Sequence, residues 1–349
     1  MASMSASIED LRIYRIPMRV RFRGLDMRTG MLLRGSAGWG EFSPFAEYGP
    51  AYASRWLAAA RDAATRPFPP PVRDDVPINT TIPAVGPTQA HDLASASGCS
   101  TAKVKVAESG QDLATDVERV AAVRDALGPT GHIRIDANGA WDVATAVLAI
   151  ARLDSAAGGL EYVEQPCVTL AELREVRGRV TVPIAADESI RTAEDPLRVA
   201  ATDAADVLVL KVQPLGGVHR ALEVAAASGL PVVVSSALET SVGLAAGLAF
   251  AAALPELPFA CGLGTASLLG SDVTDQPLLP VDGRLRVRRV APDAASLDHC
   301  APGPDESLAW LERLQAASAV LDGAASGNPY GNPSGDPSGN PYGPIDEES

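Results

Sequence analysis

The central part of the chain, from about residue 100 to 265, alternates short apolar runs with longer amphipathic stretches. A short apolar run between turn residues is typical of a buried strand, and apolar positions spaced three and four apart are typical of a helix. The runs predict strands at Ala102–Val106, Ile133–Asp136, Tyr162–Glu164, Ile184–Ala186, Val207–Leu210, Val232–Ser235 and Phe259–Gly262. Helices are expected to start near Leu113, Val143, Leu170, Pro196, Val218 and Thr240. This alternation implies a parallel sheet, either a closed barrel or an open doubly wound sheet.

The N-terminal part has a different pattern. Leu11–Ile16 and Met31–Arg34 alternate like strands, and Ala51–Ala64 has helical periodicity. We expect a small α+β capping domain over residues 1–97, to which residues 290–325 return, and a catalytic barrel domain over residues 98–289. The loop between the first two strands is expected to carry Arg19, Arg21 and Arg23. It is either a solvated hairpin tip or a cap that meets an anionic substrate.

The end of the chain repeats a turn-forming tetrapeptide. From Gly327 it reads GNPY, GNPS, GDPS and GNPY, followed by PIDEES. Gly-Asx-Pro units have turn chemistry but little apolar surface to bury. Residues 326–349 are therefore predicted to be a disordered tail.

Composition and charge narrow the class of protein. The 349 residues are 46% hydrophobic and 21% charged, which is ordinary for a globular protein, and the net charge of −14 argues against nucleic acid or an anionic membrane as partner. The cysteines are far apart with no CxxC spacing, which indicates free thiols in a reducing compartment. The N-terminus lacks a signal-peptide core, and the apolar run Val242–Leu254 is too short to span a bilayer. We expect a cytoplasmic protein, and no protein partner is implied.

Polar residues mark the end of nearly every predicted strand. They are Lys103 and Lys105, Asp136, Glu164, Asp187, Lys211, and Ser235 with Ser236. Their spacing is about one strand–helix unit, so each falls at the C-terminal end of its strand. In a closed barrel those ends form one ring, where barrel enzymes keep their active sites. Lys103 and Lys105 are two residues apart and face the same side, whereas Lys211 lies across the mouth.

The residue types in this ring predict metal-assisted proton chemistry. Three crowded carboxylates would repel one another unless a cation joins them, and oxygen ligands suit Mg²⁺, with Mn²⁺ as a possible substitute. The histidines do not fall at strand ends, which argues against zinc. Lysines near such a site can give or take a proton. A single Asp at a strand end is usually a helix cap, but six such groups in phase favour one combined site.

Five short motifs resemble those of the enolase superfamily, muconate-lactonizing subgroup. They are Lys103-Val104-Lys105, Asp136-Ala137-Asn138, Glu164-Gln165-Pro166, Asp187-Glu188-Ser189 and the run from Lys211 to Gly217. Arg134 two residues before the first acid, Val76–Asn79 and Ser235–Ser241 add to the resemblance, which covers about residues 8 to 320. It implies a modified TIM-type (β/α)7β barrel with an N-terminal α+β capping domain. Members of this superfamily pair a Lys or His base with Mg²⁺.

The resemblance also implies a role for each site residue. Asp136, Glu164 and Asp187 would bind the metal. Lys105 would act as the acid/base, Lys211 would stabilise the intermediate from the other face of the substrate ring, and Lys103 would keep the pKa of Lys105 depressed. Implied substrate-binding residues are Arg134, Asn138, Ser235, Ser236 and Gly262. One departure stands out, because the Gly262-Leu-Gly264-Thr loop lacks the acidic residue expected after the Leu.

The implied reaction is the Mg²⁺-dependent dehydration of 2-succinyl-6-hydroxy-2,4-cyclohexadiene-1-carboxylate to 2-succinylbenzoate through an enediolate, on the route to menaquinone. The substrate would be a small carboxylate. One alternative is a racemase of N-succinylamino acids or a dipeptide epimerase of the same superfamily, which needs the same metal and a lysine on each face. Further alternatives are a metal-free Schiff-base aldolase and a non-enzymatic binding scaffold; three aligned carboxylates argue against the aldolase.

Overall fold

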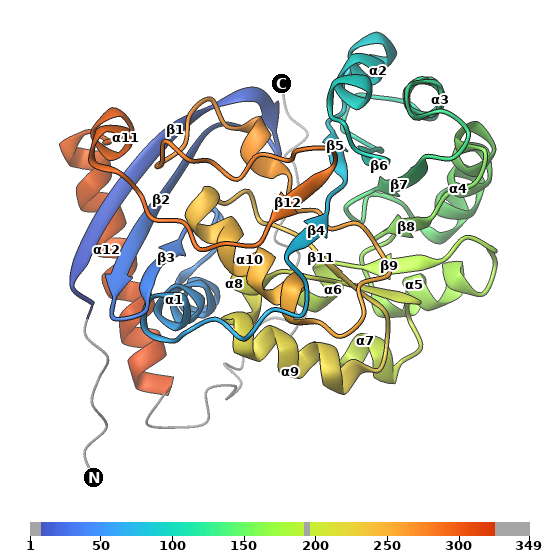
Figure 1. Cartoon of the computed structure of the whole chain (residues 1–349). Coiled ribbons are helices and arrows are strands. Elements are labelled where there is room, and N and C mark those ends of the chain that lie inside the picture. The colour runs from blue at the N-terminus through green and yellow to red at the C-terminus, as the bar shows by residue number, and fades with distance from the viewer. Residues whose placement is uncertain (1–7, 192–195, 325–349) are drawn as a thin grey trace, which may run out of the picture.

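The N-terminal part is an antiparallel sheet with a helix packed on it (Figure 1). The computed structural model of the chain describes residues 8–191 and 196–324. The sheet comprises β1 (Asp10–Phe22), β2 (Leu25–Gly35) and β3 (Gly38–Phe42), and the helix is α1 (Pro50–Thr65). The helix lies close to the sheet at Gly40, where a Cβ atom would lie 2.0 Å from the carbonyl oxygen of Ala60. Glycine at this position is therefore required by the helix–sheet packing.

A parallel sheet of seven strands forms the central part of the molecule, and neighbouring strands follow the order of the chain. The strands are β5 (Thr80–Ile82), β6 (Thr101–Lys105), β7 (His132–Asp136), β8 (Tyr162–Glu164), β9 (Ile184–Ala186), β10 (Val207–Leu210) and β11 (Val232–Val234). Parallel bridges from Ser235 to Gly262 and from Ile78 to Cys261 connect its two edges. The sequential order and these bridges confirm a barrel and exclude the doubly wound sheet.

Helices follow the strands and cover the outside of the barrel (Figure 1). They are α2 (Pro87–Ala96), α3 (Leu113–Leu127), α4 (Val143–Ala157), α5 (Leu170–Arg177), α6 (Glu188–Arg191), α7 (Arg198–Ala201), α8 (Val212–Leu215), α9 (Val218–Ser228) and α10 (Ser241–Ala253). Side-chain caps set several starts: Asp112 accepts a hydrogen bond from the N–H of Thr115, and Thr169 forms a capping box with Glu172. Helices start near all of the expected positions; the one near Pro196, α7, starts at Arg198 and is a single turn.

The remaining elements connect the two parts of the molecule. They are β4 (Asp75–Pro77), the 3₁₀ helix η1 (Thr265–Leu268), β12 (Arg284–Arg286), α11 (Ala294–His299) and α12 (Pro304–Ala324). The last helix returns to the N-terminal sheet, where Trp310 meets Phe42 edge to face at 5.9 Å and Asp322 pairs with Arg61 at 2.9 Å. Over residues 8–191 and 196–324, every helix is too short or too polar to cross a membrane.

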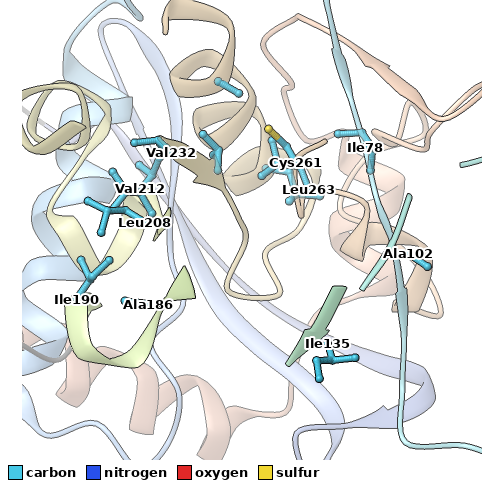
Figure 2. Close-up of a cluster of buried hydrophobic side chains, with 14 of the residues drawn as sticks. Ile78, Ala102, Ile135, Ala186, Ile190, Leu208, Val212, Val232, Cys261 and Leu263 are labelled. Atoms are coloured by element: carbon cyan, nitrogen blue, oxygen red, sulfur yellow. The ribbon is translucent and has the colours of Figure 1, made fainter. Parts of the chain in front are cut away.

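Alternation along each barrel strand separates an outer apolar layer from the barrel interior. Side chains such as Ala102, Ile135 and Leu208 pack between the strands and the surrounding helices (Figure 2). The intervening positions point inward, where Tyr162, Ala185, Val207, Val209 and Val233 form a second, smaller cluster. Because side chains alternate between the two faces of a strand, Lys105, Asp136 and Glu164 also point into the barrel.

Some details of the structure differ from the expectations, and one expected segment lies outside the described residues. β1 runs on to Phe22, so Arg19 and Arg21 lie on a strand and only Arg23 lies in the turn. Phe259–Gly262 contributes isolated bridges rather than an extended strand, and the short strand β5 was not among the predicted ones. The expected tail over residues 326–349 lies outside the described residues, and the predicted domain limits stay predictions.

Candidate active site

The lysines and carboxylates predicted from the strand ends come together in the barrel mouth. Asp136, Glu164 and Asp187 are at most 1% exposed, and Lys103 and Lys211 are 7% exposed. Asp136 is the register partner of Lys105 on one side and of Glu164 on the other. The barrel register therefore places these groups side by side, as the strand-end spacing predicted.

Ion pairs join the lysines to the carboxylates. Lys105 Nζ lies 2.6 Å from an Asp136 oxygen, and Lys103 Nζ lies 3.2 Å from the same oxygen and 2.9 Å from Glu164. Across the mouth, Lys211 pairs with Asp187. Each lysine is thus held by a carboxylate on a neighbouring strand, and Lys103 and Lys105 share one oxygen of Asp136.

These three are the only lysines in the whole sequence, in which every other cationic side chain is an arginine or a histidine. Arginine stays protonated at all working pH values, whereas lysine can lose its proton when its surroundings favour the neutral form. All lysines of the chain therefore lie in the site where the sequence predicts proton transfer.

Burial and neighbouring charges act in opposite directions on these groups. Burial raises the pKa of Glu164 to about 7, and the charge of Asp136 adds to the effect. Burial alone would also raise the pKa of Asp136, but the ammonium groups of Lys105 and Lys103 outweigh it and hold that pKa well below its usual range. For Lys103, burial opposes the charged form, yet the carboxylates of Glu164 and Asp136 raise its pKa above the usual value.

The donor set fits a hard cation, although the side chains do not stand in a coordinating arrangement. Among the described residues, no three His, Cys, Asp or Glu side chains are grouped around one point, and lysine ammonium groups contact the carboxylates instead. Glu164 Oε2 is buried and has no hydrogen-bond partner within the described part of the chain. Mg²⁺ binds carboxylate oxygens. A buried carboxylate oxygen that accepts no hydrogen bond, next to two further buried carboxylates, therefore suits it as a ligand.

Backbone contacts behind the ring hold its members in place. The side-chain oxygen of Gln165 accepts hydrogen bonds from the N–H groups of Asp187 (3.0 Å) and Ser189 (3.2 Å), which ties the end of β8 to the end of β9. On the outer side of β6, Arg119 donates to the carbonyl oxygen of Lys105 at 2.9 Å. These contacts position Asp187, a predicted metal ligand, and Lys105, the predicted acid/base.

Most of the predicted substrate-binding residues line one pocket in the mouth. Asn138, Ser235, Ser236 and Gly262 lie on its wall with the lysines, Asp136 and Asp187, and Asn138 also accepts a hydrogen bond from Lys105 at 2.7 Å. Residues that the sequence reasoning did not single out complete the wall: Phe22, Phe45, Thr81, Glu188, Ala237, Leu238 and Thr265. Of these, Glu188, Ala237, Leu238 and Thr265 lie in motifs named above, whereas Phe22, Phe45 and Thr81 come from remote segments. Arg23 from the hairpin turn also reaches the pocket.

Arg134 lies inside the barrel and is not among the lining residues. It is fully buried, and it donates to Glu161 at 2.6 Å, to the Tyr162 hydroxyl at 3.0 Å and to the carbonyl oxygen of Ala260 at 2.7 Å. Its prediction as a substrate-binding residue remains a prediction. The contacts show a packing role, because a buried guanidinium with these acceptors fills the barrel interior beneath the mouth.

A second and larger hollow lies away from the strand ends. Its wall includes Phe68, the prolines 69–71, Arg288 and Arg289. Arginine supplies the only ionisable groups on this wall among the described residues, so it lacks the acid/base pair that the barrel mouth has.

Two family models match the chain. Residues 87–294 match the model described as enolase C-terminal domain-like, and residues 13–64 match the one described as enolase N-terminal domain-like. Among solved structures, muconate lactonizing enzyme from Pseudomonas fluorescens is similar with a TM-score of 0.73 and 20% identity, over 85% of this chain and all of that one. This likeness shows the fold.

Close relatives narrow the family further. The chain is 64% identical to o-succinylbenzoate synthase of Thermobifida fusca, over 88% of its own length and 96% of the relative. It is 54% identical to o-succinylbenzoate synthase of Mycobacterium ulcerans, over 92% of its own length and 97% of the relative. The chain therefore belongs to the enolase superfamily and, within it, to the o-succinylbenzoate synthase family.

Proposed function

We propose that this chain is an o-succinylbenzoate synthase, which dehydrates 2-succinyl-6-hydroxy-2,4-cyclohexadiene-1-carboxylate to 2-succinylbenzoate. The observation that carries the proposal is the placement of two lysines on opposite sides of one pocket. Lys105 lies at the end of β6 and Lys211 follows β10, three intervening strands away, yet both line the same mouth. The high identity to synthases of this name supports the substrate.

In this proposal Lys105 carries the proton transfer. A neutral Lys105 takes the proton from the ring carbon next to the carboxylate and later gives a proton to the departing hydroxyl, so that one water leaves overall. Its Nζ lies 2.7 Å from the Asn138 side-chain oxygen, which orients the amine. Lys211, which stays protonated, faces the other side of the ring and stabilises the negative charge that develops.

Asp136, Glu164 and Asp187 would hold Mg²⁺ in this proposal. When bound, the ion would supply positive charge next to the substrate carboxylate. Lys103 would then remain as the cation between Asp136 and Glu164, where it now makes two ion pairs. Because the product is aromatic, positioning and charge stabilisation account for most of the catalytic demand.

The test follows substrate consumption by absorbance with Mg²⁺ and after EDTA treatment. We expect turnover that EDTA abolishes and added Mg²⁺ restores. A parallel incubation of N-succinylamino acids in D₂O distinguishes the racemase alternative, because exchange of the α-proton without turnover of the cyclohexadiene would favour that reaction and contradict the synthase proposal.

A further inference from the structure

A buried carboxylate of the N-terminal sheet caps a barrel helix. Glu41 on β3 is 3% exposed and accepts hydrogen bonds from the hydroxyls of Tyr14 and Ser43, both at 2.7 Å. The same carboxylate accepts from the backbone N–H groups of Thr240 and Gly243, both at 3.1 Å. The first turn of α10 has no acidic residue of its own, so Glu41 supplies negative charge where the helix dipole favours it.

A buried arginine of the same sheet holds the turn that precedes α10. Arg28 on β2 is 2% exposed, and it donates to the carbonyl oxygens of Leu238 (2.8 Å) and Ala237 (3.2 Å). Leu238 has a φ of 65°, a left-handed conformation that costs free energy for a leucine. Such a conformation persists only when surrounding contacts impose it, and the Arg28 guanidinium makes those contacts.

The cluster also reaches the segment that follows Lys211. Ser43, which accepts a hydrogen bond from Arg28 at 2.8 Å, lies beside Gln213, with its backbone N–H 3.4 Å from the side-chain oxygen of Gln213. Gln213 lies two residues beyond Lys211. The N-terminal sheet thus contacts the chain just after two consecutive barrel strands, β10 and β11.

One wall of the candidate pocket depends on these contacts. Residues 235–238 line the pocket, whereas Arg28 and Glu41 do not. We propose that Arg28 and Glu41 are positioning residues: they fix segment 235–240 in the conformation that holds the carboxylate substrate. The inference rests on the proposed function only for the identity of that substrate. Without Arg28, Leu238 is free to relax to a negative φ. The chain would then leave Leu238 in a different direction, and the pocket wall formed by residues 235–238 would shift.

The experiment compares four variants in the full chain with Mg²⁺ present. Arg28→Met removes the donors to the turn, and Arg34→Met is the matched control, since Arg34 lies on the same strand with its side chain 55% exposed. Thr240→Val removes the hydroxyl that donates to Glu41 at 2.5 Å, and Thr240→Ser keeps it. Steady-state KM and kcat are measured together with backbone hydrogen exchange of residues 235–242 and, as an internal reference, of α3.

We expect Arg28→Met and Thr240→Val to accelerate exchange in residues 235–242 about tenfold or more and leave α3 unchanged. A displaced wall also weakens substrate binding, so KM should rise about tenfold or more while kcat changes less. Arg34→Met and Thr240→Ser should match the wild type in both measurements.

Two results would overturn the inference. In the first, the Arg28→Met and Thr240→Val proteins fold and retain wild-type exchange and KM. In the second, a lower melting temperature is the only change, which indicates a purely structural role. A wild type that leaves the cyclohexadiene untouched while Arg28→Met still accelerates local exchange would refute the proposed function and support the positioning role. The exchange measurement therefore separates the two failures.

Discussion

At the scale of single residues, proton transfer and positive charge can be separated at Lys105. The Lys105→Arg variant keeps a cation that can pair with Asp136, but a guanidinium does not release its proton. We expect Lys105→Arg and Lys105→Ala both to lower kcat by about 10²–10⁴-fold, the range that a positioned acid/base contributes. Stopped-flow absorbance with the cyclohexadiene substrate measures the effect. Substantial activity in Lys105→Arg would mean that charge alone is required.

A second residue-scale prediction concerns Glu239, which lies beside the positioning cluster. Burial raises its pKa to about 7, and the charge of Glu41 adds to the effect. The folded protein therefore keeps this proton to a higher pH than the unfolded chain, so the stabilisation is complete below the unfolded pKa and is lost as pH rises to about 7. The loss amounts to roughly 3 kcal/mol for the shift from 4.5 to about 7.

Glu239→Gln should remove this pH dependence, because an amide does not ionise. Denaturant unfolding at pH 5 and pH 8 measures it: the variant should gain stability relative to the wild type at pH 8 and little at pH 5. Glu118→Gln on the exposed face of α3 is the control and should leave the pH profile unchanged. A wild-type profile that is retained in Glu239→Gln would assign the dependence to another group.

At the scale of elements, α10 depends on close approach at its first turn. A Cβ atom at Gly243 would lie 2.6 Å from Glu239 Cβ and 2.8 Å from Glu41 Oε2, whereas at Gly247 the nearest atom is the flexible end of Leu263 at 2.8 Å. Both Gly→Ala changes gain the same helix propensity, about 1 kcal/mol. Gly243→Ala should nevertheless destabilise the protein by about 1–3 kcal/mol through overpacking, and Gly247→Ala should be near neutral. Equal melting temperatures for the two variants would contradict the packing argument.

Elements also differ in how well the sequence predicts them. Strands such as Ile184–Ala186 and Val207–Leu210 could be predicted, because buried parallel strands are continuous apolar runs and their ends carry the polar residues of the site. The strand β5, Thr80–Ile82, has no such run, and the predicted run Phe259–Gly262 completes the barrel through isolated bridges rather than as an extended strand. Arg28 and Glu41 could not be predicted either, since Glu41 meets Thr240 across 199 positions of the chain.

At the scale of the whole molecule, chemical modification of lysine side chains should probe a single site, the barrel mouth. The sequence offers a modifying reagent three lysine side chains and one α-amino group. The side chains of Lys103, Lys105 and Lys211 are 9%, 12% and 8% exposed and paired with carboxylates, which limits the access of a reagent to their nitrogen atoms. The folded protein should therefore protect every lysine from modification, and unfolding of the barrel should remove this protection.

Reductive methylation followed by peptide mass mapping tests this. The α-amino group should react first without loss of activity, because it is remote in sequence from the strand ends. Activity should then fall in step with methylation of the peptides that contain residues 101–105 and 211, and 2-succinylbenzoate should slow both. In urea the three lysines should react much faster than they do in the native protein. Rapid lysine methylation in the native protein with activity retained would contradict both the low exposure and the catalytic role of these amines, since the sequence has no other lysine to account for it.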